Sequence, residues 1–185
     1  MKQRLLIGIS GASGAPLAVE LLRILKEIDI ETHVIVTYGG QLTLKQECGM
    51  DSISELADVI YDNGEIGAGP ASGSFKTLGM IVIPCSMKTV AGIHSGYSDS
   101  LLLRAADVTL KERRKLVLVA RETPLSTIHL RNLYELSQMG VVVLPPMLSY
   151  YHKPESLDEM THYTVCRVLD QFGIAIPGFK RWEGI

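Results

Sequence analysis

The sequence predicts an α/β fold in which a parallel sheet is covered by helices on both faces. Short continuous apolar runs, such as residues 4–10, are typical of strands buried on both faces. Stretches with apolar residues at helical spacing follow several of these runs, so strands and helices alternate along the chain. The chain has 185 residues, 46% of them hydrophobic, which suits a single domain over 1–185 that needs no metal or disulfide to complete its core.

The first elements follow from periodicity. Residues 4–10 form the first expected strand, and residues 17–28 carry apolar side chains at the spacing of a helix face. The run 32–37 is rich in β-branched residues and predicts a second strand. Residues 41–47 and 52–59 are expected to form two short helices.

The middle of the chain is less regular. Residues 61–77 are rich in Gly, Ala and Ser and predict a long loop of the kind that often carries function. A third strand is expected at 80–83, ended by Pro84, and a helix at 98–114 leads to a strand at 116–120. The remaining expected elements are a helix at 126–139, a strand at 141–144, a helix at 157–172 and an irregular tail at 173–185.

Composition excludes several classes of protein. The 18 basic and 20 acidic residues give a net charge of −2, which argues against a nucleic-acid binder that depends on electrostatics. The three cysteines lack CxxC spacing and the five histidines lack metal-binding spacing, so we expect neither disulfides nor a metal site. No apolar run approaches the ~18 residues of a spanning helix, so we expect a cytoplasmic protein. The mean hydropathy of +0.20 suggests apolar surface buried between subunits.

Ligands of parallel sheets bind beyond the carboxyl ends of the strands, where this chain has a glycine loop. Gly8, Gly11 and Gly14 form a GxxGxxG pattern, with Ser10 and Ser13 between them. Glycines let backbone N–H groups approach a phosphate, and the start of the following helix favours an anion. The pattern is not the dinucleotide signature GxGxxG, and a tight turn without a ligand is the alternative interpretation.

Other strand ends carry hydroxyl and charged groups. Ser86 and Thr89 offer hydroxyls to a phosphate or ring edge, whereas Cys85 lacks an evident histidine partner and is read as structural. Arg121 and Glu122 follow a strand and suit phosphate binding and proton transfer. Arg113 and Arg114, near Lys111, are more simply read as a solvated helix end.

The loop 145–152 is apolar and aromatic, and Arg167 lies on the helix after it. Such a loop suits a pocket for a flat ring or an alkyl chain, with packing of the core as the alternative. The residues by themselves thus indicate a small phosphate-bearing ligand, a partly aromatic pocket, several cations and no metal.

Six motifs resemble the flavin prenyltransferase family (UbiX-like proteins, formerly regarded as aromatic or hydroxyarylic acid decarboxylase subunits). They run in order along almost the whole chain and are jointly specific, although each is weak alone. The motifs are GASGA from Gly11, PASGS from Pro70, PCS from Pro84, RAADV from Arg104, LKERR from Leu110 and RETPLS from Arg121.

The resemblance implies a flavodoxin-like Rossmann fold, with three layers around a parallel sheet, that assembles into a dodecamer. It implies metal-independent transfer of a dimethylallyl group from dimethylallyl phosphate to N5 and then C6 of reduced FMN. The product, prenylated FMN, would serve a separate UbiD-like aromatic acid decarboxylase.

The resemblance also implies roles for individual residues. Ser13, Glu122, Lys111, Arg104 and Glu47 match catalytic positions, with Glu47 expected to reach the site from a neighbouring subunit. Lys111, Tyr151 and Arg167 match the groups that hold the prenyl phosphate. The FMN-contacting positions are Gly11, Ala12, Ser13, Thr37, Ser86, Met87, Lys88, Thr89 and Arg121.

The sequence departs from the family at two places and leaves alternatives open. Tyr38 and Gly39 replace a pair that is commonly basic then small, and Met87-Lys88 stands where small residues are frequent. One alternative is a flavin-dependent decarboxylase of peptidyl or pantothenoyl cysteine, which typically has a histidine after the second strand; residues 37–47 have none. The other is a non-catalytic FMN-binding subunit of a decarboxylase.

Overall fold

The computed structural model describes residues 2–179, 181, 182 and 184 of the chain. Within these residues a six-stranded parallel sheet has the order β3-β2-β1-β4-β5-β6. The strands are β1 (Gln3–Ile9), β2 (Ile30–Val36), β3 (Val59–Asp62), β4 (Gly79–Cys85), β5 (Lys115–Ala120) and β6 (Val142–Val143). The helices are α1 (Ala15–Lys26), α2 (Tyr38–Cys48), the 3-10 turn η1 (Gly69–Ala71), α3 (Met87–His94), α4 (Leu101–Lys111), α5 (Thr127–Gln138) and α6 (Leu157–Asp170).

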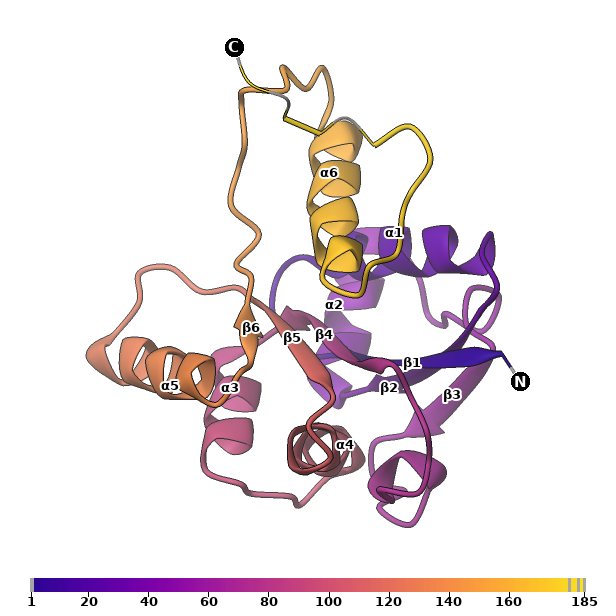
Figure 1. The fold of residues 1–185 in the computed structure, drawn as a ribbon, viewed down its shortest axis with the longest axis vertical. Coiled ribbons are helices and arrows are strands. Elements are labelled where there is room, and N and C mark those ends of the chain that lie inside the picture. Colours follow the sequence, from indigo (N-terminus) through magenta and orange to yellow (C-terminus); the bar gives the residue numbers. More distant parts are fainter. Residues whose placement is uncertain (1, 180, 183, 185) are drawn as a thin grey trace.

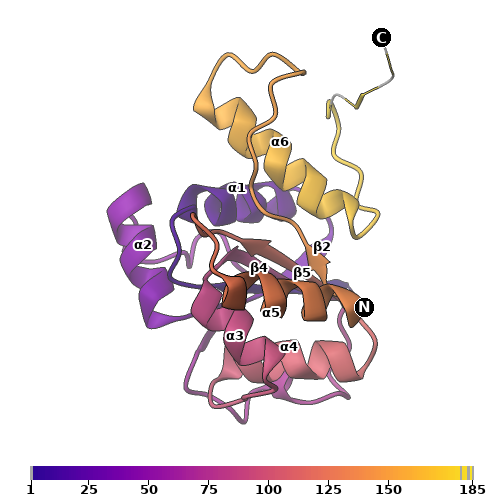
Figure 2. The same ribbon diagram turned by 90° about the vertical axis from the view of Figure 1, so that its left-hand side faces the viewer.

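Helices cover both faces of the sheet, which confirms the expected class (Figures 1 and 2). One core joins the sheet to α1 and α6 and includes Leu21, Leu25 and Val168, all fully buried. The other joins it to α3, α4 and α5 and includes Leu101 and Leu136. β1 and β4 lie in the middle of the sheet and are buried on both faces, as their continuous apolar runs predicted. Within the described residues, no helix is both long and apolar enough to cross a membrane.

The helix expected at 52–59 was wrong, because this segment turns and then enters the sheet as β3. Asp58 explains the difference. Its carboxylate accepts hydrogen bonds from the amide and hydroxyl of Thr32 at 2.7 and 2.8 Å, and its own amide donates to the Thr32 hydroxyl at 2.9 Å. This exchange attaches the segment to the start of β2, so that Val59 and the residues after it pair beside that strand.

The strand expected at 80–83 is β4 in the structure, and Pro84 does not end it, because β4 continues to Cys85. The register with β5 shifts between Val82 and Cys85, which accommodates a residue without an N–H donor. The carbonyl of Pro84 accepts a hydrogen bond from the amide of Ser10 at 3.2 Å, and this bond connects β4 to the loop after β1.

The sequence did not predict α3, which begins directly after Ser86. The Ser86 hydroxyl accepts the amide of Thr89 at 3.3 Å and caps this helix. The helix expected at 98–114 is shorter, since α4 ends at Lys111 and the backbone reverses at Arg113, with φ of 55°.

Candidate active site

Four loops meet at the carboxyl edge of the sheet, where the sequence predicted the ligand. The Ser10 hydroxyl donates to the Pro84 carbonyl at 3.0 Å and accepts the Ser86 amide at 2.8 Å, which fastens the loop after β1 to the loop after β4. The Arg121 amide donates to the Cys85 carbonyl at 3.1 Å, and the Thr37 amide donates to the Ile9 carbonyl at 3.0 Å. These bonds bring together the predicted FMN-contacting positions Gly11, Ala12, Ser13, Thr37, Ser86, Met87, Lys88, Thr89 and Arg121.

The backbone at this edge forms a close cradle. A Cβ on Gly11 would lie 2.9 Å from the Cα of Gly39, so the loops after β1 and β2 pack backbone against backbone. Small residues at both positions are therefore required by geometry, and they leave main-chain groups open to a ligand. This is one observation that fits a flavin phosphate or ring edge at this place.

Three helices begin at the same edge, and their starts determine its electrostatics. Thr37 caps α2 by accepting the amide of Gly40 at 3.1 Å, and Ser86 caps α3 in the same way. The partial positive charges at the starts of α1, α2 and α3 all face the ligand edge and favour an anion. The hydroxyls of Thr37 and Ser86 thus act as helix caps in addition to their predicted contacts with the flavin.

Glu47, in the last turn of α2, places its carboxylate at the start of α1. Its Oε2 accepts the amides of Gly14 and Ala15 at 2.9 and 2.8 Å, while α1 has no cap from its own preceding side chain. Within one chain, the last turn of α2 thus carries Glu47 to the glycine loop. Its expected part in the site of a neighbouring subunit stays a prediction. A phosphate at this edge finds two amides of α1 already bonded to a carboxylate, which leaves it the Ser13 side chain and the starts of α2 and α3.

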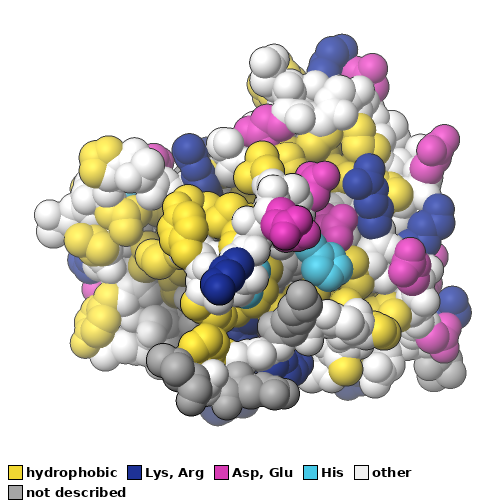
Figure 3. Space-filling view, turned by 90° about the horizontal axis from the view of Figure 1, so that it is seen from above, with side chains coloured by type: hydrophobic (Ala, Val, Ile, Leu, Met, Phe, Trp, Pro, Cys, Tyr) yellow, Lys and Arg dark blue, Asp and Glu magenta, His cyan; other side chains and the backbone are white. Residues whose placement is uncertain are grey.

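A cavity of about 490 Å³ opens beside Ser13 and Glu47. The loop after β6 and the first half of α6 supply most of its other walls, including Met147, Leu148 and Met160. Hydrophobic side chains gather on this face of the molecule (Figure 3). The apolar pocket predicted from residues 145–152 is thus present and suits an alkyl group rather than a charged one.

Tyr151 is linked to this cavity by Tyr163, whereas Arg167 lines a neighbouring cavity together with Asp170 and Arg181. The Tyr151 hydroxyl is hydrogen-bonded to that of Tyr163, which lines the cavity. This bond, together with Ser149 and the charge of Arg167, lowers the pKa of Tyr151, whereas burial first of all raises the pKa of Tyr163. Either hydroxyl can donate in this bond, and each phenol oxygen keeps further hydrogen-bonding capacity for a phosphate oxygen.

Glu122 follows β5 at the ligand edge and is exposed. Its Oε1 accepts the amide of Thr123 at 3.0 Å, which orients the carboxylate. Cys85, by contrast, is fully buried, and burial raises the pKa of its thiol far above the usual range. This supports the structural interpretation of Cys85.

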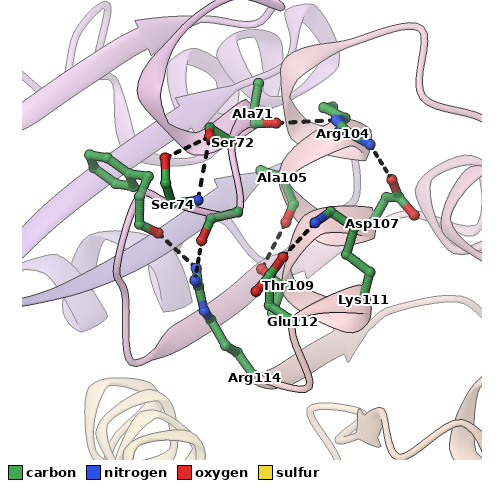
Figure 4. Close-up of polar contacts among 12 residues, drawn as sticks. Ala71, Ser72, Ser74, Arg104, Ala105, Asp107, Thr109, Lys111, Glu112 and Arg114 are labelled. Atoms are coloured by element: carbon green, nitrogen blue, oxygen red, sulfur yellow. Dashed lines mark hydrogen bonds and ion pairs between the residues drawn. The ribbon is translucent and has the colours of Figure 1, made fainter.

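The structure does not bring Lys111 and Arg104 to the site of their own chain. Helix α4 starts beside the end of β3, where Leu101 donates to the Asn63 carbonyl at 2.8 Å, and it runs toward the opposite edge of the sheet. Lys111 pairs there with Glu112, and Arg104 donates to the Ala71 carbonyl at 3.2 Å and to Asp107 at 2.6 Å (Figure 4).

These cations lie along the PASGS segment that begins at Pro70. Arg114 donates to the carbonyls of Gly73 and Phe75 at 2.6 and 2.7 Å and fixes the segment from the same side (Figure 4). A single chain therefore holds two separate groups of the predicted residues. One contains the flavin edge and the apolar cavity, and the other contains Arg104 and Lys111.

Sequence reasoning missed two residues that surround the predicted phosphate ligands. Asp170 pairs with Arg167 at 3.1 Å, and Trp182 packs on Tyr151 with ring centres 5.4 Å apart. The i,i+3 spacing of Arg167 and Asp170 on a helix was a usable signal for the first pair. Nothing in the sequence indicates the second contact.

Comparison with known proteins gives consistent matches over the chain. The family model for flavoproteins matches residues 1–168. Flavin prenyltransferase UbiX of Escherichia coli strain K12 is 50% identical, over 98% of this chain and 99% of its own length. The crystal structure of a dodecameric FMN-dependent UbiX-like decarboxylase from Escherichia coli O157:H7 is 51% identical and superimposes with a TM-score of 0.96, covering 98% of this chain and 100% of that one. The structure of AnUbiX (PadA1) in complex with FMN and dimethylallyl pyrophosphate is 43% identical, with a TM-score of 0.96 and full coverage of both chains.

Proposed function

The chain belongs to the UbiX-like flavin prenyltransferase family, and we propose that it transfers a dimethylallyl group from dimethylallyl phosphate to N5 and C6 of reduced FMN. The observation that carries this proposal is the placement of an apolar cavity directly beside Ser13, at an edge formed by three helix starts. An anion-binding edge suits the phosphates of both ligands, and the cavity suits the prenyl chain.

The phosphate leaves when the allylic carbon–oxygen bond breaks, and the new negative charge needs stabilisation. Tyr151 donates a hydrogen bond and Arg167 a positive charge to the leaving group. Lys111 is the third predicted ligand of this phosphate. Because it lies at the far end of α4, it acts in the site of another copy of the chain.

The same reasoning applies to Arg104, which lies beside Lys111 along the 70–74 segment. A dodecamer would bring this surface of one subunit to the flavin edge of the next, in line with the dodecameric structure of a similar protein. The complete site then contains Ser13, Glu47, Glu122, Tyr151 and Arg167 from one subunit and Arg104 and Lys111 from another.

The apolar walls of the cavity protect the allylic carbon from water while the bond to flavin forms. Reduced FMN supplies an electron-rich N5 as the nucleophile, and the protein positions the two ligands. Ring closure adds C6 across the prenyl double bond, so the prenyl chain gains a proton, which released phosphate can donate, and C6 loses one. Glu122 at the end of β5 accepts the proton from C6, with released phosphate as the alternative acceptor. The prenylated FMN is then passed to a UbiD-like aromatic acid decarboxylase.

Anaerobic turnover tests the proposal directly. Purified protein is mixed with reduced FMN and dimethylallyl phosphate, without metal or partner protein, and the extracted flavin is analysed by mass spectrometry. We expect a flavin heavier by one prenyl unit, and a parallel reaction with the diphosphate shows which donor is used. Unmodified FMN that stays tightly bound would instead support a non-catalytic FMN-binding subunit.

Single-turnover kinetics of Glu122→Gln tests the second half of the reaction. We expect slow ring closure with nearly unchanged FMN binding, because glutamine keeps the shape of the side chain but does not accept the proton. An unchanged rate of ring closure would refute this role of Glu122.

A further inference from the structure

The carboxylate of Asp170 binds two arginines at the end of α6. Arg167, one turn earlier, donates to Oδ2 at 3.1 Å, and Arg181 donates to Oδ2 and Oδ1 at 2.9 and 2.5 Å. The Asp170 side chain is only 12% exposed, whereas about half of each arginine side chain is exposed. The Arg181 hydrogen bond holds the pKa of Asp170 below its usual value, with Arg167 adding to the effect, so the carboxylate is ionised at neutral pH.

The segment that carries Arg181 folds back along α6 (Figures 1 and 2). Trp182 packs edge-on against Tyr151, and Phe179 packs against Tyr163 with ring centres 5.3 Å apart. The Arg181 guanidinium lies 5.1 Å from the centre of the Phe179 ring. Two residues of the C-terminal segment, Phe179 and Trp182, therefore contact the aromatic pair Tyr151 and Tyr163 beside the apolar cavity. Arg181 lies between them in the sequence and anchors the segment to the helix through Asp170.

We propose that Asp170 is a positioning residue of the prenyl-phosphate site, which orients Arg167 and holds Trp182 against Tyr151 through Arg181. The proposal rests on the proposed function for the roles of Tyr151 and Arg167 as phosphate ligands. Asp170 itself does not touch the substrate. Its effect passes through the two arginines and the C-terminal segment.

The geometry of the two pairs explains why the carboxylate does not neutralise Arg167. Arg181 forms the bidentate fork and uses both oxygens of Asp170, so Arg167 makes a single bond through one Nη atom. An arginine has five N–H donors, and most of those of Arg167 stay free for phosphate oxygens. Loss of Arg181 would let Asp170 bind Arg167 bidentately and withdraw it from the phosphate.

The chain contains one tryptophan, Trp182, which makes the docking of the segment directly measurable. In Asp170→Asn, the neutral amide offers one acceptor oxygen and no charge, so it holds the guanidinium of Arg181 much more weakly. We expect Trp182 fluorescence to shift to longer wavelength and acrylamide quenching to increase. We also expect the KM for dimethylallyl phosphate to rise roughly threefold to tenfold, with unchanged FMN affinity, because a charge-assisted contact that orients Arg167 is lost.

Two further variants make the test specific. Arg181→Gln removes the anchor from the exposed partner and should give the same exposure of Trp182, even if Asp170→Asn folds poorly. The double variant should expose Trp182 no more than either single variant, because both act through one contact. Asp29→Asn is the matched control, since it removes an exposed ion pair with Lys2, 3.1 Å long, far from the C-terminal segment.

The outcomes separate this proposal from the proposed function. Failure of the wild-type protein to transfer a prenyl group refutes the function, and the affinity for inorganic phosphate, measured by calorimetry, then replaces KM in the comparison. Unchanged quenching of Trp182 in Asp170→Asn and Arg181→Gln overturns the anchoring role. Exposure of Trp182 without loss of affinity for either phosphate compound overturns the positioning role.

Discussion

Replacement of Glu47 by alanine should weaken the start of α1. The variant loses the acceptor of two backbone amides, at 2.9 and 2.8 Å, and a negative charge at a helix N-terminus. Loss of a cap costs about 0.5–2 kcal/mol, and the charge adds about 0.3–1 kcal/mol. Because the Glu47 side chain is exposed, we take the lower half of these ranges together, about 1–2 kcal/mol. For a chain of 185 residues this lowers Tm by about 2–8 °C.

Thermal unfolding followed by circular dichroism measures this effect. Gln46→Ala is the matched control, because Gln46 is the exposed neighbour of Glu47 on the same turn of α2. Glu47→Gln keeps one acceptor oxygen and should fall between the two. Phosphate added to Glu47→Ala should recover more stability than in the wild type, since the freed amides can then bind the anion. Equal Tm values for Glu47→Ala and Gln46→Ala would refute the capping role.

Two other predictions concern contacts with the sheet and a residue within it. Gly40→Ala, at the start of α2, would place a Cβ 2.4 Å from the carbonyl oxygen of Ile9 at the end of β1. We therefore expect the free energy of unfolding to fall by about 1–3 kcal/mol and FMN binding to weaken. Gly67→Ala is the control and should change neither, because the space around Gly67 is open. Burial lowers the pKa of His33, so the folded state resists protonation of this side chain. The contribution of neutral His33 to the free energy of unfolding is therefore fully present above the unfolded pKa of about 6.5 and is lost as pH falls below it. Denaturant unfolding between about pH 5 and 7 should show this slope in the wild type and lose most of it in His33→Gln, and an equal slope in both would contradict the assignment.

Local sequence was sufficient for most of the sheet and for the flavin edge. The central strands and the first and last helices follow from apolar periodicity, which depends only on neighbouring residues. The position of Ser13, Ser86 and Arg121 at one edge follows from the parallel topology, because successive strands all end on the same side. The cap of α3 was also readable in principle, since Ser86 stands three residues before Thr89.

The features that local sequence did not predict have a common origin in contacts between distant segments. Asp58 pairs with Thr32 and draws β3 into the sheet against a helical pattern. Glu47 reaches the glycine loop of its own chain because α2 packs beside α1. Neither contact has a local signature, because each depends on how two elements are placed relative to each other.

The sequence by itself determined the α/β class, the ligand edge and, through its motifs, the family of the protein. Periodicity, capping and loop composition are local properties, and they are written in consecutive residues. Only the tertiary structure decided which predicted residues meet in one chain. It separated Lys111 and Arg104 from Ser13 through the direction of α4, and it joined Asp170, Arg181 and Trp182 to Tyr151. These relations depend on the packing of helices against opposite faces and ends of the sheet, which no single stretch of sequence encodes.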